Sequence, residues 1–88
     1  MDKVKRQAIC EMGYENAIVF DTPDYDDAII GITDEGQVVY DFEDMINCLV
    51  EKDNMSELEA IEFIEYNTIR ALPYAGENAP IIMHKIMM

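Results

Sequence analysis

Two short apolar segments separated by three residues place the firmest constraint on how this chain can fold. Residues 28–33 and 37–40 are rich in Ile and Val, the β-branched residues that favour strands. The intervening residues 34–36 end in Gly36, and glycine readily adopts the left-handed conformation that closes a hairpin loop of this length. The sequence therefore predicts an antiparallel hairpin with a positive φ angle at Gly36.

Two amphipathic helices are expected after the hairpin. Asp41 is placed to cap the first helix, which ends at Asn54. Its apolar residues recur at helical spacing: Phe42, Met45, Ile46, Leu49 and Val50. The second helix begins at Ser56, which can form a capping box with Glu59, and it ends before Pro73 because the residue before a proline disfavours helical geometry. Its apolar side is predicted to consist of Leu58, Ile61, Ile64, Thr68 and Leu72.

The two ends of the chain are expected to add one helix and two strands. Asp2 can cap a helix that runs to Met12 and is ended by a left-handed Gly13. The apolar stripe of this helix consists of Val4, Ala8, Ile9 and Met12. Short apolar segments at 17–20 and 81–86 are typical of strands.

The predicted order of elements, α-β-β-β-α-α-β, indicates an α+β protein with a single domain spanning residues 1–88. Three successive strands with short connections favour an antiparallel meander. The helices are then expected to cover one face of this sheet.

Negative charge is concentrated in the middle of the chain. Residues 11–68 hold seventeen acidic side chains and a single basic one, Lys52. The whole chain has 19 acidic and 6 basic residues, for a formal net charge of −13. Such a chain repels phosphates, so we expect no direct binding to nucleic acid. We expect no membrane association either, because no apolar run is long enough to span a bilayer and residues 1–6 are too polar for a secretory signal.

The sulfur-containing residues favour a reducing compartment. Cys10 and Cys48 are too few for the disulfide framework of a small secreted domain, so we expect two buried or half-buried thiols. Seven methionines also fit a cytoplasmic protein better than an exported one. The sequence therefore predicts a cytoplasmic location.

The acidic segment after the first predicted strand is a weak match to a metal site. It contains Asp21, Asp24, Asp26 and Asp27, but it lacks the turn glycine and the closing glutamate of a calcium loop. We interpret it as a solvated turn whose aspartates cap local backbone groups. We therefore expect no bound metal.

The few nucleophilic residues give little support to an enzyme. Cys10, Cys48 and His84 lie in three separate predicted elements and carry no signature of a thiol with its base. His84 is expected to share a strand face with the apolar Ile82 and Ile86. The methionines that could bind soft copper, Met83, Met87 and Met88, are better explained by packing and by a loose terminus. No carboxylate is marked as buried, as a general acid–base pair requires, so we expect neither catalysis nor a cofactor.

Part of the negative charge has a local structural reason, because acidic residues in first helical turns interact well with the helix dipole. Of the remaining acids, those proposed to form an exposed, partner-binding acidic face are Asp24, Asp26, Asp27, Glu51, Glu62 and Glu65. Carboxylates one helical turn apart are ~5–6 Å from each other, close to the phosphate spacing of a nucleic-acid strand. Such a face can occupy a basic groove that otherwise holds DNA or RNA. The alternative interpretation is that the acidic surface only maintains solubility.

A second candidate binding surface surrounds the only basic residue between Lys52 and Lys85. Arg70 has no acidic residue three or four positions before it, so stacking on Tyr66 is its expected local contact. Tyr74 lies just beyond and extends the same surface. The alternative is that Arg70 only complements the dipole at the end of its helix.

Several segments from Glu15 onward carry a resemblance to known proteins. They are residues 15–21, 28–33, 37–41, 59–67, 70–74 and 79–82. Over about four-fifths of its length the chain resembles a family of short uncharacterised proteins of gut bacteria and of their phages or mobile elements. The resemblance implies a bacterial or phage context and supplies no activity, cofactor or site residues.

These features predict a small, acidic, non-enzymatic protein-binding module of a mobile element. In its most specific form it is an inhibitor that mimics nucleic acid and blocks a basic nucleic-acid-binding protein of a defence system, as anti-restriction and anti-CRISPR proteins do. One alternative is an antitoxin or accessory subunit that binds one protein through the apolar and tyrosine-bearing surface near residues 66–74. A small enzyme is a further alternative. The identity of the partner and the oligomeric state stay open.

Overall fold

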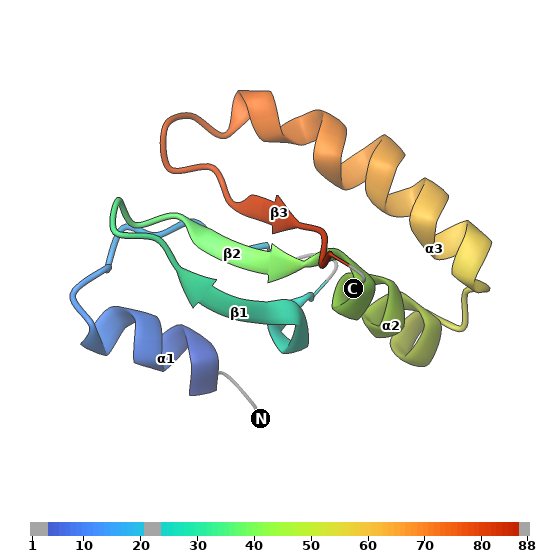
Figure 1. The fold of residues 1–88 in the computed structure, drawn as a ribbon, viewed down its shortest axis with the longest axis horizontal. Coiled ribbons are helices and arrows are strands. Elements are labelled where there is room, and N and C mark those ends of the chain that lie inside the picture. Colours follow the sequence, from blue (N-terminus) through green and yellow to red (C-terminus); the bar gives the residue numbers. More distant parts are fainter. Residues whose placement is uncertain (1–3, 21–23, 87–88) are drawn as a thin grey trace.

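The computed structural model describes residues 4–20 and 24–86. Figure 1 shows a small sheet with helices around it. The elements, in chain order, are α1 (Val4–Glu11), η1 (Asp26–Ala28), β1 (Ile29–Ile32), β2 (Val38–Asp41), α2 (Phe42–Asp53), α3 (Glu57–Phe63), η2 (Ile64–Thr68), η3 (Ile69–Tyr74) and β3 (Ile81–Met83). Of the segments labelled η, the first and third are 3₁₀ turns and η2 is a π-helical turn. The chain is therefore an α+β protein, as the sequence predicts.

The predicted hairpin is present and is closed as expected. β1 and β2 pair in antiparallel orientation, and a bulge between Ile29 and Gly31 interrupts their register. The Thr33 amide donates to the Gln37 carbonyl at 2.8 Å, and the Gly36 amide donates to the Thr33 carbonyl at 3.0 Å. Gly36 has a φ angle of +93°, which confirms its predicted left-handed conformation.

The sheet is mixed, so the expected antiparallel meander is wrong. Its strand order is β1-β2-β3, and β3 runs parallel to β2, with Val39 opposite Ile81. Parallel neighbours need a long crossover connection, and the helical segments α2, α3, η2 and η3 supply it. The Gln37 side chain adds a bond from Nε2 to the Ala79 carbonyl at 3.0 Å, just before β3 begins.

Residues 17–20 form no strand, because side chains from other elements take up the backbone groups of Phe20. Its amide donates to the Tyr40 hydroxyl at 2.9 Å, and its carbonyl accepts from Nη2 of Arg6 at 3.0 Å. The Phe20 ring also packs against two tyrosines, at 5.7 Å from Tyr25 and 4.8 Å from Tyr40. The segment is thus held by aromatic packing and side-chain bonds.

The helix caps predicted from the sequence are confirmed. The Asp41 carboxylate accepts from the Asp44 amide at 3.0 Å at the start of α2, and Asn54 ends that helix with a φ angle of 58°. Ser56 and Glu59 form both bonds of a capping box. Each cap satisfies amides that the first turn of a helix leaves without partners.

The second of these helices is not the continuous α-helix predicted from Ser56 to Leu72. The α-helical part ends at Phe63 and is followed by the π turn η2 and the 3₁₀ turn η3, which contains Pro73. Leu58, expected on the apolar side, is 65% exposed, whereas Ile64 and Thr68 are buried. The buried side of this segment is therefore concentrated in the π turn, where Thr68 Oγ1 lies 3.2 Å from the Tyr25 hydroxyl.

Helix α1 is attached mainly by its positive charges, and its predicted apolar stripe is wrong. Ile9 is its only buried residue, and Val4 and Met12 are 74% and 63% exposed. Lys5 Nζ donates to the Ile29 carbonyl at 2.9 Å, and Arg6 binds Asp26 at 2.8 Å. The end of α1 agrees better with the sequence, because Gly13 has the predicted positive φ angle. Asp2, the predicted cap, lies outside the described residues.

The last strand is shorter than predicted, since β3 ends at Met83. His84 therefore does not lie on a strand face with Ile82 and Ile86. It is exposed, and its ring stacks on Phe42 with 4.5 Å between ring centroids. Met87 and Met88 lie outside the described residues.

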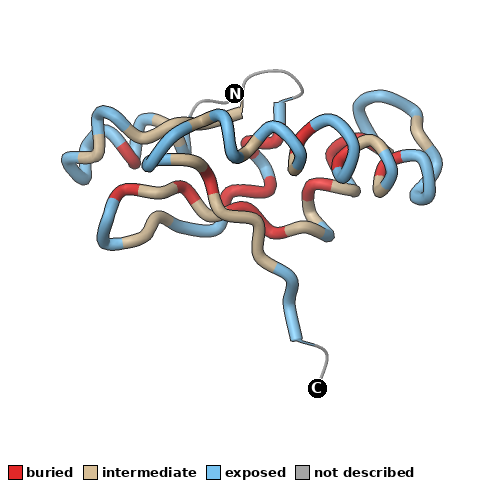
Figure 2. The backbone as a smooth tube through the Cα atoms, turned by 90° about the horizontal axis from the view of Figure 1, so that it is seen from above, coloured by how far each residue is buried: buried red, intermediate tan, exposed pale blue. Residues whose placement is uncertain are grey.

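The hydrophobic core lies on one face of the sheet. The register places Val38, Tyr40 and Ile82 on this face, whereas Val39 and Ile81 on the opposite face are half-buried. Met45 and Leu49 of α2 join the same buried cluster. Figure 2 shows the buried positions gathered in the middle of the molecule, with exposed turns around them.

Candidate functional site

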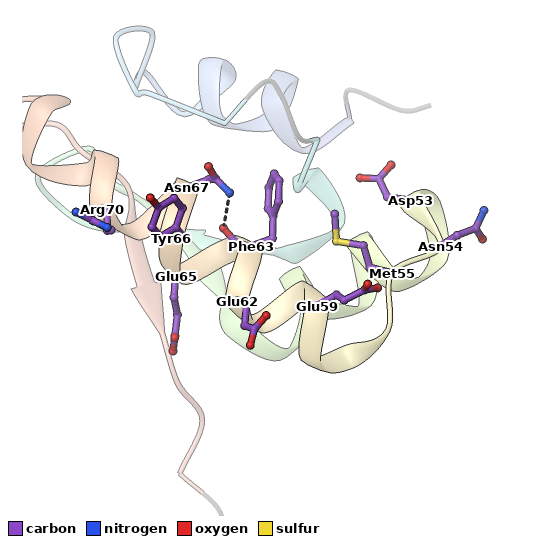
Figure 3. A pocket seen from close by; sticks show the side chains of 10 residues that line it. All are labelled: Asp53, Asn54, Met55, Glu59, Glu62, Phe63, Glu65, Tyr66, Asn67 and Arg70. Atoms are coloured by element: carbon purple, nitrogen blue, oxygen red, sulfur yellow. Dashed lines mark hydrogen bonds between the residues drawn. The ribbon is translucent and has the colours of Figure 1, made fainter.

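One shallow groove extends from the α2–α3 loop along the outer side of α3, η2 and η3, and has a volume of about 850 Å³. The helical residues that line it recur at spacings of three and four: Glu59, Glu62, Phe63, Tyr66, Asn67 and Arg70. Glu65 lines it as well, and the end of α2 and the loop that follows add Asp53, Asn54 and Met55. We call this surface the α3 groove (Figure 3).

The groove has an apolar side and an acidic side. Met55 and Phe63 are half-buried and form the apolar side. Figure 3 shows Phe63 leaving the helix in one direction, whereas Glu62 and Glu65 extend in the other. Both of these glutamates are exposed. A partner that fits this surface must itself be amphipathic.

A smaller hollow continues the apolar side. It has a volume of about 440 Å³ and shares Asp53, Met55 and Phe63 with the α3 groove. Asp24 and Cys48 are among its other lining residues. The smaller hollow thus extends the apolar side of the α3 groove to Leu49 and also contains the basic Lys52.

Arg70 lies at the end of the α3 groove that is farthest from the α2–α3 loop (Figure 3). Its guanidinium carbon is 5.0 Å from the centre of the Tyr66 ring, which confirms the predicted stacking. Both side chains are exposed. Within the part of the chain that the structure describes, Arg70 has no carboxylate partner.

The π turn determines how the middle of the groove is presented. The Ile69 amide donates to the Ile64 carbonyl, five residues earlier, and the Asn67 side chain donates to the Phe63 carbonyl at 3.3 Å. Glu65, Tyr66 and Asn67 belong to this turn, and π turns inside helices are frequent at functional sites.

The structure brings four of the predicted binding residues together. Glu62 and Glu65, proposed for the acidic face, line the same groove as Tyr66 and Arg70, proposed for the alternative surface. Tyr74 is 90% exposed and does not line it. The two surfaces distinguished in the sequence thus overlap at these four residues.

The other predicted acidic residues are dispersed. Glu51 is exposed on α2 but lines neither hollow, and Asp24 lines only the smaller one. Asp24 also accepts from the Asp26 amide at 2.9 Å, as predicted for a local backbone cap. Asp27 is exposed and lies 3.6 Å from Lys52 Nζ.

Asp26 does not belong to an exposed acidic face, which corrects that part of the sequence prediction. The residue is only 6% exposed, and both of its carboxylate oxygens accept from Nε of Arg6, at 2.8 and 3.0 Å. The carboxylate thus fixes α1 to the segment before β1. Asp21 lies outside the described residues, and in the described ranges no group of three or more acidic, His or Cys side chains is arranged to hold a metal ion.

The two cysteines differ in their surroundings. Cys48 is buried as predicted, and this burial raises the pKa of its thiol, although nearby Lys52 opposes the shift. Cys10 is exposed, so the expectation that both thiols are at least half-buried is wrong for that residue.

The sequence prediction missed the apolar side of the groove and the π turn. Phe63 carried a usable signal, because it is a large apolar residue outside the predicted apolar side of its helix. The π turn has no comparable signal in the sequence.

Comparisons of the chain with protein-family models, curated proteins and solved structures gave no match. The search for membrane spans, limited to residues 4–20 and 24–86, found no helix with the length and apolar character to cross a bilayer. The geometry of the α3 groove is therefore the basis for the functional proposal.

Proposed function

We propose that this chain is a non-enzymatic, acidic protein-binding module and that the α3 groove binds a basic, amphipathic segment of a partner protein. One observation carries the proposal: the half-buried Met55 and Phe63 lie beside the exposed carboxylates Glu62 and Glu65 on a single surface. Under this proposal, both this chain and its partner are cytoplasmic.

The two sides of the groove have different physical roles. Fully burying an exposed apolar side chain contributes roughly 1.5–3 kcal/mol. Met55 and Phe63 are already half-buried, so covering their remaining exposed surface supplies a part of that affinity. Exposed carboxylates contribute less to affinity but attract a basic segment and exclude an acidic one. The net charge of −13 strengthens this long-range attraction and makes it sensitive to salt.

In its narrowest form, the partner is a basic nucleic-acid-binding protein of a bacterial defence system, and the acidic side of the groove takes the place of phosphates. The charge of the chain supports this form, and the phage or mobile-element context comes from the resemblance described above. An antitoxin or accessory subunit would instead depend mainly on Met55, Phe63 and Tyr66.

Binding of defined peptides tests the proposal. The probe is a fluorescently labelled helical peptide with Lys on one side and Leu on the other, and anisotropy gives its Kd. We expect the Glu62→Gln/Glu65→Gln variant to bind it more weakly. The Glu11→Gln/Glu51→Gln variant has the same net charge and changes exposed residues outside the groove, so it should bind like the parent chain.

Two further peptides complete the test. A peptide with the Leu positions changed to Ser and an amphipathic peptide with Glu in place of Lys should both bind at least about tenfold more weakly, because each lacks one of the two complementary features. Equal losses for the two double variants would contradict binding at the groove. They would favour a uniformly acidic surface, and a partner that DNA displaces would then support mimicry of nucleic acid.

A further inference from the structure

The α3 groove contains one positive charge, and its surroundings differ from those of the other bases. The structure describes five basic side chains, and four of them bind oxygen atoms of the protein. Lys5 binds backbone carbonyls, and Arg6, Lys52 and Lys85 each lie within 4 Å of a carboxylate. Arg70 alone has only an aromatic contact within the described part of the chain.

This difference is unexpected from the composition. The chain has 19 acidic residues and only 6 basic ones, so a basic side chain has many potential partners. Positions three and four before Arg70 hold Asn67 and Tyr66, and positions three and four after it hold Pro73 and Tyr74. No acidic residue is therefore placed one helical turn away, where a local ion pair would form.

The Tyr66 ring restricts the guanidinium to one region at the end of the groove. Stacking leaves the N–H groups at the edge of the guanidinium plane free to donate, and two of them match the two oxygens of a carboxylate. Such a donor loses less conformational freedom on binding than a free arginine does. The arrangement is thus prepared for a planar anionic group.

We propose that Arg70 determines the direction of the bound segment by receiving a Glu or Asp side chain from it. This inference rests on the proposed function of the α3 groove. The segment would be basic where it passes Glu62 and Glu65 and would carry a single acidic residue near Arg70. Arg70 lies eight positions after Glu62, which is about 12 Å along a helix. The acidic residue of the segment therefore lies about two turns from the lysine that faces Glu62.

The test extends the Lys/Leu peptide at one end or the other with Glu, or with Gln as a control. One of the two Glu peptides should bind the parent chain about two- to fivefold more tightly than its Gln control, the gain expected from an ion pair at an exposed site. Arg70→Gln should abolish this gain, so that each Glu peptide binds the variant no more tightly than its Gln control. Arg70→Glu should instead favour a peptide that ends in Lys.

Tyr66 is a positioning residue in this scheme. Tyr66→Leu should reduce the preference for Glu over Gln, and Tyr66→Phe should retain it, because Phe keeps the ring. Both side chains are exposed, so circular dichroism and the melting temperature should be unchanged in all of these variants.

The results separate this inference from the proposed function. If both Glu peptides bind like their Gln controls while Glu62→Gln/Glu65→Gln still weakens binding, the role of Arg70 is overturned and the groove remains. If the parent chain binds no Lys/Leu peptide, the proposed function itself fails.

Discussion

The ion pair between Arg6 and Asp26 offers a sharp test of how α1 is held. The side chains are 21% and 9% exposed, so neither charge is well solvated. Arg6 also donates from Nη2 to the Phe20 carbonyl at 3.0 Å. Removing Arg6 therefore leaves the poorly solvated Asp26 carboxylate without this ion pair.

Breaking a buried pair costs about 3–5 kcal/mol. We expect Arg6→Met to lower the free energy of unfolding by about 3 kcal/mol, the low end of that range, because Arg6 is not fully buried. Asp26→Asn should cost about 2 kcal/mol, since Asn keeps the shape and one acceptor. The double variant should cost less than the sum of the two, because it leaves no unpaired charge.

Equilibrium unfolding in urea measures these differences, and Asp27 provides the control in the adjacent position. Its side chain is 79% exposed and its ion pair with Lys52 is 3.6 Å long, so Asp27→Asn should cost no more than about 0.5 kcal/mol. Similar losses for Asp26→Asn and Asp27→Asn would refute the argument. A loss below about 1 kcal/mol for Arg6→Met would refute it as well.

Three further predictions concern the hairpin, alkaline pH and metals. Gly36→Val should lower the free energy of unfolding in urea by about 1–2 kcal/mol, because a β-branched residue resists a positive φ angle. Gly31→Ala should lower it by well under about 1 kcal/mol, since Gly31 has open space around it and no positive φ angle. Equal effects of the two substitutions would contradict the turn geometry. Burial raises the pKa of Cys48 from its usual 9.0 and that of Tyr25 from its usual 10.0, so the unfolded chain releases these protons first and stability should fall as pH rises above 9. Cys48→Ala should reduce the early part of that fall and Tyr25→Phe the later part, as urea midpoints at successive pH values would show; unchanged pH profiles would contradict the assignment. A chelator should leave the melting temperature unchanged, and a decrease that calcium reverses would instead indicate a metal site.

Features encoded by neighbouring residues could be predicted from the sequence. The hairpin closed by Gly36, the caps at Asp41 and Ser56 and the stacking of Arg70 on Tyr66 each depend on residues a few positions apart. Local rules for turns, caps and helical neighbours apply directly in such cases. Their geometry in the fold agrees with the prediction.

Features that depend on distant packing could not be predicted in the same way. Asp26 and Asp27 are adjacent in sequence, yet one is buried against Arg6 and the other faces solvent. Residues 17–20 have strand composition, but Tyr40 takes up the amide that a strand partner would need. The α3 groove needs both the bend of the α2–α3 loop and the π turn, so only part of its residue set was recognisable.

The parallel position of β3 has a consequence for how the fold forms and opens. Val39 pairs with Ile81, 42 positions later, whereas Val38 pairs with Ile32, only 6 positions away. Closing the longer loop carries the larger entropic cost, so the hairpin forms early and β3 joins late. By the same reasoning β3 detaches first in partial unfolding, and the exposed edge of β2 can then accept β3 from another copy. Strand exchange between molecules is therefore expected at β2, the central strand of the sheet.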